Sequence, residues 1–159
     1  MSTYLTLKQS VKKNGAGFIV LIDPDKKNDE KVIGLVENAN LNGADAIFVG
    51  GSIMMDSFYN ERVKKIKSIS NIPVILFPGG VNQISKHFDA ILFMSLLSGR
   101  NPHYLIGEQV LAAPIIKDIG IETIPTAYLL IDGGSSTSVE YISAVSYTHL
   151  TLPTKRIVY

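Results

Sequence analysis

The sequence contains no cysteine, so neither a disulfide nor a thiolate metal site is available to the chain. It also lacks an excess of either charge, because 15 Lys and Arg balance 14 Asp and Glu for a net charge of +1. No basic stripe points to nucleic acid, and no acidic run points to a charged partner. No apolar run is long enough to span a bilayer, and the N-terminus lacks the apolar core of a signal peptide. These absences are compatible with a cytoplasmic protein that has no integral membrane segment.

Apolar sequence, by contrast, is plentiful: 46% of the 159 residues are hydrophobic, enough for the core of one domain. Much of it lies in five short runs rich in β-branched residues, which are typical of parallel strands covered on both faces. The runs lie at residues 17–23, 46–50, 74–77, 90–94 and 122–131. Helical patterns separate most of them, so the sequence predicts an α/β fold with right-handed crossovers.

The predicted helices differ in length. The first is expected to begin after Asn28, acting as its N-cap, and to end at Gly43. The next has one apolar face and is expected to turn Arg62 largely to solvent. Only residues 81–88 separate the third and fourth strands, so this unit is abbreviated. A longer helix precedes the fifth strand, and Pro114 is expected to kink it or to end its regular part.

Two architectures fit five strands that alternate with helices. One is a flavodoxin-like open sheet, and the other is roughly the first five βα units of a (β/α)8 TIM barrel. Polar or glycine-rich segments follow strands one, two, three and five, whereas an open sheet would concentrate them at a single switch point. We therefore favour the partial TIM barrel, with an extra helix near residues 4–13 covering its floor.

The ends of the first two strands carry the residues best suited to a phosphate group and its metal ion. Asp23 offers a carboxylate, and Mg²⁺ is usually held by one or two carboxylates together with substrate phosphate oxygens. Gly51 allows backbone N–H groups to approach an anion, and the Ser52 hydroxyl can bind Mg²⁺ or phosphate. Lys26 can neutralise phosphate charge, and the aromatic ring of Tyr104 can line an apolar channel. Each segment alone also fits an ordinary turn, and Tyr104 an ordinary core position; the combination favours a site.

Several segments, taken in order, resemble the geranylgeranylglyceryl phosphate synthase family. Leu-Ile-Asp-Pro-Asp-Lys-Lys stands at residues 21–27, and Ile-Phe-Val-Gly-Gly-Ser at residues 47–52. Residues 77–80, 97–102 and 127–131 are similar to later motifs of that family. The resemblance covers roughly residues 18–143, and the ordered set is more specific than any one motif.

The resemblance implies a modified eight-stranded barrel in which one outer helix is replaced. It implies Mg²⁺-assisted transfer of a prenyl group from a prenyl diphosphate to the 3-hydroxyl of sn-glycerol 1-phosphate, for ether-lipid synthesis. By motif, Asp23 is the catalytic residue and, with Ser52, a metal ligand. Lys26, Gly51 and Tyr104 are substrate-binding positions. The resemblance also implies a homo-oligomeric full-length form, and peripheral membrane contact for product release is a further expectation.

The chain departs from the family after the fifth strand. Family members continue through three more strands, whose loops hold the glycerol phosphate, and none of those motifs is present here. The segment from about residue 144 instead resembles translated sequencing-adapter sequence, although an edge strand interrupted by Pro153 is an alternative. We therefore expect residues 1–143 to be the N-terminal part of a TIM-barrel prenyltransferase domain, residues 144–159 to be a non-native tail, and this fragment to be inactive.

Two other functions remain open from the sequence. A sugar-phosphate isomerase or aldolase would also use a phosphate-binding barrel, but no lysine stands inside a predicted strand to act in its catalysis. A non-enzymatic α/β ligand-binding module would already be complete with five strands. The module predicts that the chain folds cooperatively by itself, whereas the transferase predicts that it needs the missing strands.

Overall fold

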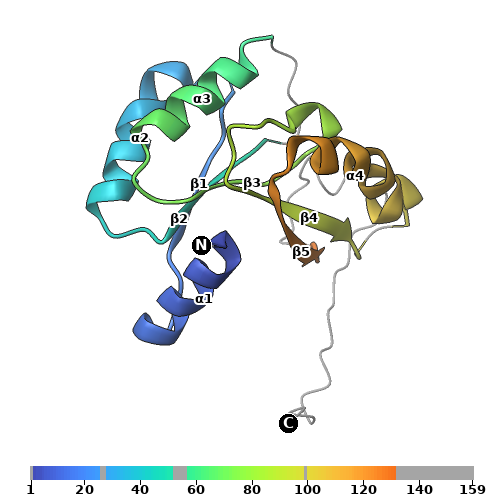
Figure 1. Ribbon diagram of the computed structural model, residues 1–159, viewed down its shortest axis with the longest axis horizontal. Coiled ribbons are helices and arrows are strands. Elements are labelled where there is room, and N and C mark those ends of the chain that lie inside the picture. The colour runs from blue at the N-terminus through green and yellow to red at the C-terminus, as the bar shows by residue number, and fades with distance from the viewer. Residues whose placement is uncertain (1, 26–27, 52–56, 99, 132–159) are drawn as a thin grey trace.

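The structure is a computed structural model that describes residues 2–25, 28–51, 57–98 and 100–131. Within them lies a parallel sheet of five strands in the order β1-β2-β3-β4-β5 (Figure 1). The strands are β1 Ile19–Ile22, β2 Ala46–Val49, β3 Val74–Leu76, β4 Ala90–Leu96 and β5 Glu122–Tyr128. All five predicted strands are confirmed. The spatial order follows the chain order with no reversal, which fits a barrel and not the flavodoxin-like sheet.

Helices alternate with the strands, with one short exception. The α-helices are α1 Thr3–Asn14, α2 Asp29–Leu41, α3 Tyr59–Ile69 and α4 Glu108–Ile119; the shorter turns are the 3₁₀ helix η2 Val81–Gln83 and the π-helix η3 His103–Gly107. Between β3 and β4 the chain forms only η2, as the shortness of that segment predicts. The leading helix predicted near residues 4–13 is α1.

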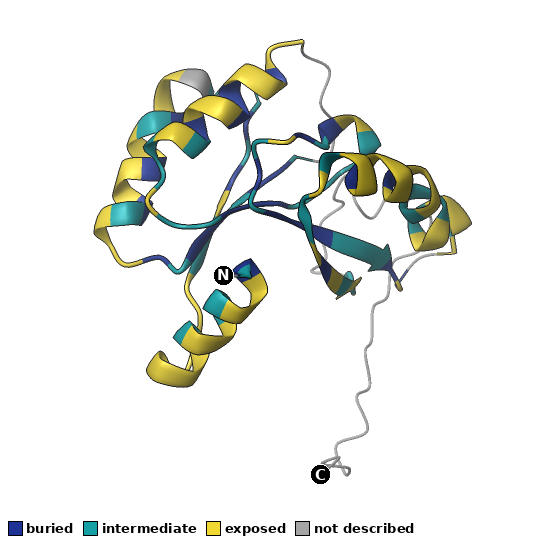
Figure 2. Cartoon of the chain, in the orientation of Figure 1, coloured by how far each residue is buried: buried dark blue, intermediate teal, exposed yellow. Residues whose placement is uncertain are grey.

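The two faces of the sheet carry different cores. Val74 and Leu76 of β3 pack with α2, α3 and α4 in the larger core, whereas Ile75 between them belongs to a second cluster on the opposite face. This alternation is the period-2 pattern of a strand that is buried on both sides. Figure 2 shows the buried residues concentrated along the central strands and the facing sides of the helices, while α1 is mostly exposed. The helices therefore cover one face, and the second cluster forms the inner face of the curved sheet.

Two helix details differ from the sequence-based expectations. Asn28 is the N-cap residue of α2, as predicted, but its side chain makes no capping bond and instead donates to the Asp23 carbonyl at 3.0 Å. Gly43 does lie just beyond the helix, with a φ of 72°. The expectation that Pro114 could end α4 is wrong, because the helix continues to Ile119. Pro114 removes the hydrogen bond to the carbonyl of Val110, and 66% of Val110 is exposed, so water can replace the lost donor.

Helix α1 is attached to the start of β5 through one carboxylate. Glu122 accepts hydrogen bonds from the Ser2 hydroxyl at 2.5 Å and from the amides of Thr3 and Tyr4 at 2.6 and 3.1 Å. A carboxylate beside a helix N-terminus satisfies free N–H groups and complements the helix dipole. Burial alone would raise the pKa of Glu122, but these hydrogen bonds outweigh it and the pKa is lowered.

A second carboxylate holds the same helix near β2. Asp45, just before β2, accepts from the Ser10 hydroxyl and, at 2.7 Å, from the Phe18 amide. These two hydrogen bonds lower its pKa. Leu7 of α1 packs against the inner-face cluster. Helix α1 therefore crosses the N-terminal ends of the strands, and the predicted floor helix is confirmed.

The helices are short. None in the described part of the chain has the length and apolar character that crossing a membrane requires.

Candidate functional site

The C-terminal ends of β1, β2 and β3 bring three segments into register. Ile22 pairs with Val49, and Val49 pairs with Leu76, so the residues that follow each strand are neighbours. The Gly50 amide continues this ladder by donating to the Ile22 carbonyl at 3.2 Å. Asp23, the glycine pair after β2 and the turn after β3 therefore meet at one rim, as the barrel interpretation predicts.

The two glycines after β2 are required by close packing. A Cβ atom on Gly50 would lie 1.8 Å from the carbonyl oxygen of Phe77, at the end of the next strand. A Cβ atom on Gly51 would lie 2.7 Å from Oδ1 of Asp23. Real Cβ atoms do not approach other atoms so closely, so a side chain at either position would displace the rim. The absence of a side chain at Gly51 leaves its backbone directly against the Asp23 carboxylate.

The turn that carries Asp23 is held from several sides. Oδ1 of Asp23 accepts from the Asp25 amide at 3.2 Å, and the Asp23 carbonyl accepts from Asn28. Nε of Arg62 donates to the carbonyl of the buried Pro24 at 2.8 Å. These bonds fix the backbone on both sides of the carboxylate, which limits the positions that it can take.

Arg62 was expected to face solvent, and this expectation is wrong. Only 8% of the residue is exposed, because it lies on the buried side of α3 and reaches the Pro24 carbonyl. A guanidinium satisfies a buried carbonyl that would otherwise lose its hydrogen bonds to water. A clue was present in the sequence: position 62 lies three residues after Tyr59 and four before Ile66, which is the spacing of the buried stripe.

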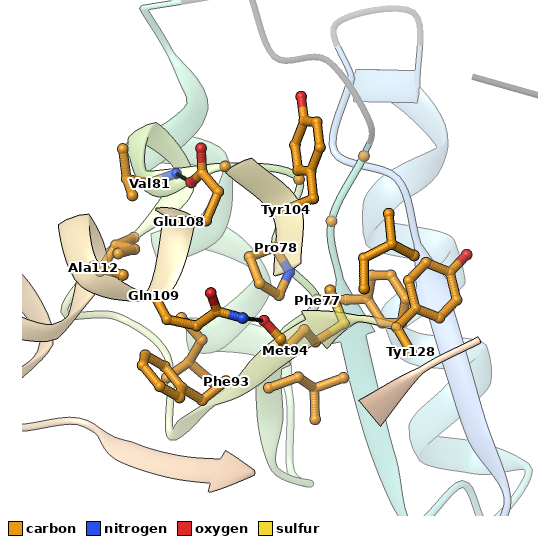
Figure 3. A pocket seen from close by; sticks show the side chains of 18 of the residues that line it. Phe77, Pro78, Val81, Phe93, Met94, Tyr104, Glu108, Gln109, Ala112 and Tyr128 are labelled. Carbon is orange, nitrogen blue, oxygen red and sulfur yellow. Dashed lines mark hydrogen bonds between the residues drawn. The ribbon is translucent and has the colours of Figure 1, made fainter. Parts of the chain in front are cut away.

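A cavity of about 320 Å³ begins at the same rim. Its wall starts at Gly50 and Gly51, passes Phe77 and Met94, and reaches Ala112 of α4 (Figure 3). Most of the lining is apolar, with aromatic rings from Phe77, Phe93, Tyr104 and Tyr128. The cavity extends between the segment that follows β3, at Val81 and Ile84, and α4, at Glu108 and Ala112. A long apolar group attached to an anionic head would suit this shape.

Tyr104 projects from the π-helix η3 onto the wall of this cavity (Figure 3). It is half-buried, and its ring lies edge-on to the ring of His103 at 4.8 Å between centroids. His103 Nε2 lies 2.7 Å from Oε1 of Glu108, whose other oxygen accepts from the Val81 amide at 2.9 Å. Tyr104 therefore stands on a wall that is tied to α4 and η2. Short π-helical insertions are frequent at functional sites.

The described donors suit a magnesium ion that is shared with a substrate. The described part of the chain contains no group of three His, Cys, Asp or Glu residues able to enclose a metal ion. Mg²⁺ needs no such cage, because one or two carboxylates and phosphate oxygens are its usual ligands. The Asp23 carboxylate against the open backbone of Gly51 fits that mode. Lys26 and Ser52, also predicted for this site, lie outside the described residues, as does the predicted boundary at residue 143.

Sequence comparison places the chain among known proteins. The profile of the PcrB family matches residues 8–154. The chain belongs to the PcrB family. A geranylgeranylglyceryl phosphate synthase from Chitinophaga pinensis is 48% identical over 126 residues, which are 79% of this chain and 50% of that protein. The resemblance stated from the motifs is thereby confirmed.

Solved structures give the same result for the fold. GGGPS from Thermoplasma volcanium matches with a TM-score of 0.79 at 36% identity, over 90% of this chain and 57% of that one. (S)-3-O-geranylgeranylglyceryl phosphate synthase from Thermoplasma acidophilum, in complex with its substrate sn-glycerol-1-phosphate, also matches with a TM-score of 0.79, at 37% identity and the same coverage. The five strands of this chain and the helices between them are thus part of a TIM barrel. The chain spans about half the length of the curated relatives that it matches.

Proposed function

We propose that the protein containing this chain transfers a prenyl group from a prenyl diphosphate to the 3-hydroxyl of sn-glycerol 1-phosphate. The observation that carries the proposal is the position of Gly51, which lies against the Asp23 carboxylate and also lines the apolar cavity. A prenyl diphosphate has the matching form, with a charged head and a long apolar tail. The names of the relatives support the same reaction.

The chemistry assigned to this half of the barrel concerns the diphosphate and the prenyl tail. The bond between the first prenyl carbon and the diphosphate oxygen breaks, the glycerol 3-oxygen bonds to that carbon, and the hydroxyl proton is released. Mg²⁺, when bound, would offset the charge that develops on the departing diphosphate. Asp23 and Ser52 would hold the ion, Lys26 and the Gly51 backbone would bind the diphosphate, and Tyr104 would contact the tail. The apolar cavity would exclude water, which would otherwise compete with the glycerol hydroxyl.

The remaining parts of the proposal are expectations that rest on the resemblance to the family. The loops after strands seven and eight are the usual phosphate site of this fold, so glycerol phosphate would bind to the part that the relatives have beyond this chain. A cytoplasmic homo-oligomer with peripheral membrane contact for product release is the expected form. An isomerase or aldolase is not favoured, because the similar curated proteins are geranylgeranylglyceryl phosphate synthases.

A chimeric protein can test the reaction. Residues 1–131 would be joined to the part of the Chitinophaga pinensis relative that follows the equivalent of Ile131; we name this protein the completed chain. Incubated with Mg²⁺, geranylgeranyl diphosphate and labelled sn-glycerol 1-phosphate, it should transfer the label to an organic-soluble ether product. The mirror-image sn-glycerol 3-phosphate is the control. A folded completed chain that forms no product would contradict the proposal.

Replacing Tyr104 with Ala in the completed chain should shift the preference toward longer prenyl diphosphates. The change removes a ring from the cavity wall, and a few methylene groups in a pocket change relative rates by at least about tenfold. The measurement is the ratio of kcat/KM values for diphosphates of increasing chain length. Tyr104→Phe, which keeps the ring, should behave like the unaltered protein. An unchanged preference in a stable Tyr104→Ala protein would return this residue to an ordinary packing role.

A further inference from the structure

Gln83, which the sequence did not single out, links two of the rim loops through one side chain. Its Nε2 donates to the Gly51 carbonyl at 2.7 Å, in the segment after β2. Its Oε1 accepts from the Gly79 amide at 2.9 Å, in the segment after β3. Only 1% of the residue is exposed, so neither bond is exchanged readily for a bond to water. A buried amide whose donor and acceptor are both hydrogen-bonded holds its neighbours in position. Breaking either bond would leave a buried polar group without a partner.

The bond to Gly51 reaches the predicted metal site. Gly51 has no side chain to anchor it, and its backbone lies against the Asp23 carboxylate so closely that a Cβ atom would sit 2.7 Å from Oδ1. A displacement of Gly51 by a few tenths of an ångström would therefore change the space beside that oxygen. Gln83 holds the Gly51 carbonyl and so limits this displacement.

The turn η2, which carries Gln83, is itself held in place by hydrogen bonds. Gln83 ends η2, and the amide of Val81, at the start of that turn, donates to Oε2 of Glu108 in α4 at 2.9 Å. The turn is therefore tied to a helix on one side, and through Gln83 to the β2 rim on the other. The Gln83 side chain thus connects the segments after β2 and β3 and ends beside the Asp23 carboxylate. Its hydrogen bonds therefore do more than stabilise η2.

We propose that Gln83 is a positioning residue for the diphosphate end of the site, acting through Gly51 on the space beside Asp23. The inference deepens the proposed function and rests on it. Glutamine suits the role because a single planar amide supplies one donor and one acceptor at opposite ends. Residues that hold a metal site from outside in this way typically change metal affinity by about 10- to 100-fold when they are replaced.

The test compares Gln83→Met with the unaltered completed chain. Methionine has a similar length and volume but forms neither hydrogen bond. Ser85→Ala is the matched control, because Ser85 is also buried in this segment and its hydroxyl accepts only from the nearby His87 amide in the described contacts. The probe is inorganic diphosphate with Mg²⁺, titrated by calorimetry without prenyl substrate. Hydrogen exchange at the Gly79 amide reports the lost bond directly.

We expect Gln83→Met to weaken binding of Mg²⁺-diphosphate by about 10- to 100-fold and to speed exchange at Gly79. Ser85→Ala should lower the melting temperature without changing that affinity. Unchanged affinity in a folded Gln83→Met protein would overturn the inference and leave Gln83 with a structural role only. If Gln83→Met does not fold, Gln83→Asn, whose amide is one methylene shorter, provides the same comparison.

The binding and transfer measurements distinguish a failure of the proposed function from a failure of the role proposed for Gln83. A completed chain that binds Mg²⁺-diphosphate but transfers no prenyl group contradicts the proposed function, while the role of Gln83 is still decided by the binding comparison. A completed chain that folds and binds no Mg²⁺-diphosphate contradicts both.

Discussion

The 159-residue chain, made by itself, is expected to aggregate or to remain loosely packed and to show no prenyl transfer. Within the described sheet, β1 and β5 each pair on one side only. Unpaired strand edges expose rows of N–H and C=O groups that invite association. Apolar side chains are exposed as well, including Leu21 on β1 at 58% and Val110 on α4 at 66%. In a whole barrel, additional βα units would lie beside β1 and β5 and cover part of the apolar surface there.

The free energy lost by leaving apolar surface in water is large enough to support this expectation. Several hundred Å² of apolar surface left in water forgo about 25 cal/mol per Å². A domain is stable by only about 5–15 kcal/mol in total, so such a deficit removes most of the margin. The measurements are size-exclusion chromatography, near-ultraviolet circular dichroism and the transfer assay, with the completed chain as the control. A soluble monomer with a sharp two-state melt and measurable glycerol phosphate affinity would instead favour a self-sufficient binding module.

Asp23→Asn in the completed chain should lower kcat/KM by about 100-fold or more while the fold is retained. The substitution changes little volume, but it removes the charge that would hold Mg²⁺, and a bound metal contributes several kcal/mol to stabilising a leaving group. The assay varies Mg²⁺ at fixed substrate, and circular dichroism checks the fold. Asp118→Asn is the control, since Asp118 is an exposed carboxylate near the C-terminus of α4, at the opposite end of the helix from the rim.

Two results would contradict this assignment. Near-normal turnover of Asp23→Asn at saturating Mg²⁺ would remove Asp23 from the mechanism. Ser52→Ala should lose less activity, because a hydroxyl contributes less than a carboxylate to binding Mg²⁺. A larger loss for Ser52→Ala than for Asp23→Asn would reverse the two roles.

The sequence was sufficient for the strands, their order and the rim at which the candidate residues meet. Runs such as residues 46–50 and 74–77 are short and apolar, which is typical of buried parallel strands, and parallel strands bring their C-terminal ends to one rim. The proximity of Asp23 and Gly51 follows from that geometry. These features depend on local pattern and on topology, both of which can be read from one sequence.

The side chains that hold the site could not be predicted in the same way. Gln83 lies 32 positions from Gly51, and Arg62 lies 38 positions from Pro24. Both are polar residues in polar segments, where exposure is the usual outcome. The helical spacing of position 62 is a clue to the burial of Arg62, but the carbonyl groups that Arg62 and Gln83 reach become known only when the loops have been placed in three dimensions.

The attachment of α1 also sets an order of assembly. The hydrogen bond from Ser2 to Glu122 joins residues 120 positions apart. Helix α1 is synthesised before the other described elements, but its N-terminus cannot dock there until β5 has been synthesised and has paired with β4. Closing so long a loop is slow compared with forming the local βα units. Although it precedes them in the chain, α1 is therefore expected to be among the last of the described elements to reach its final contacts.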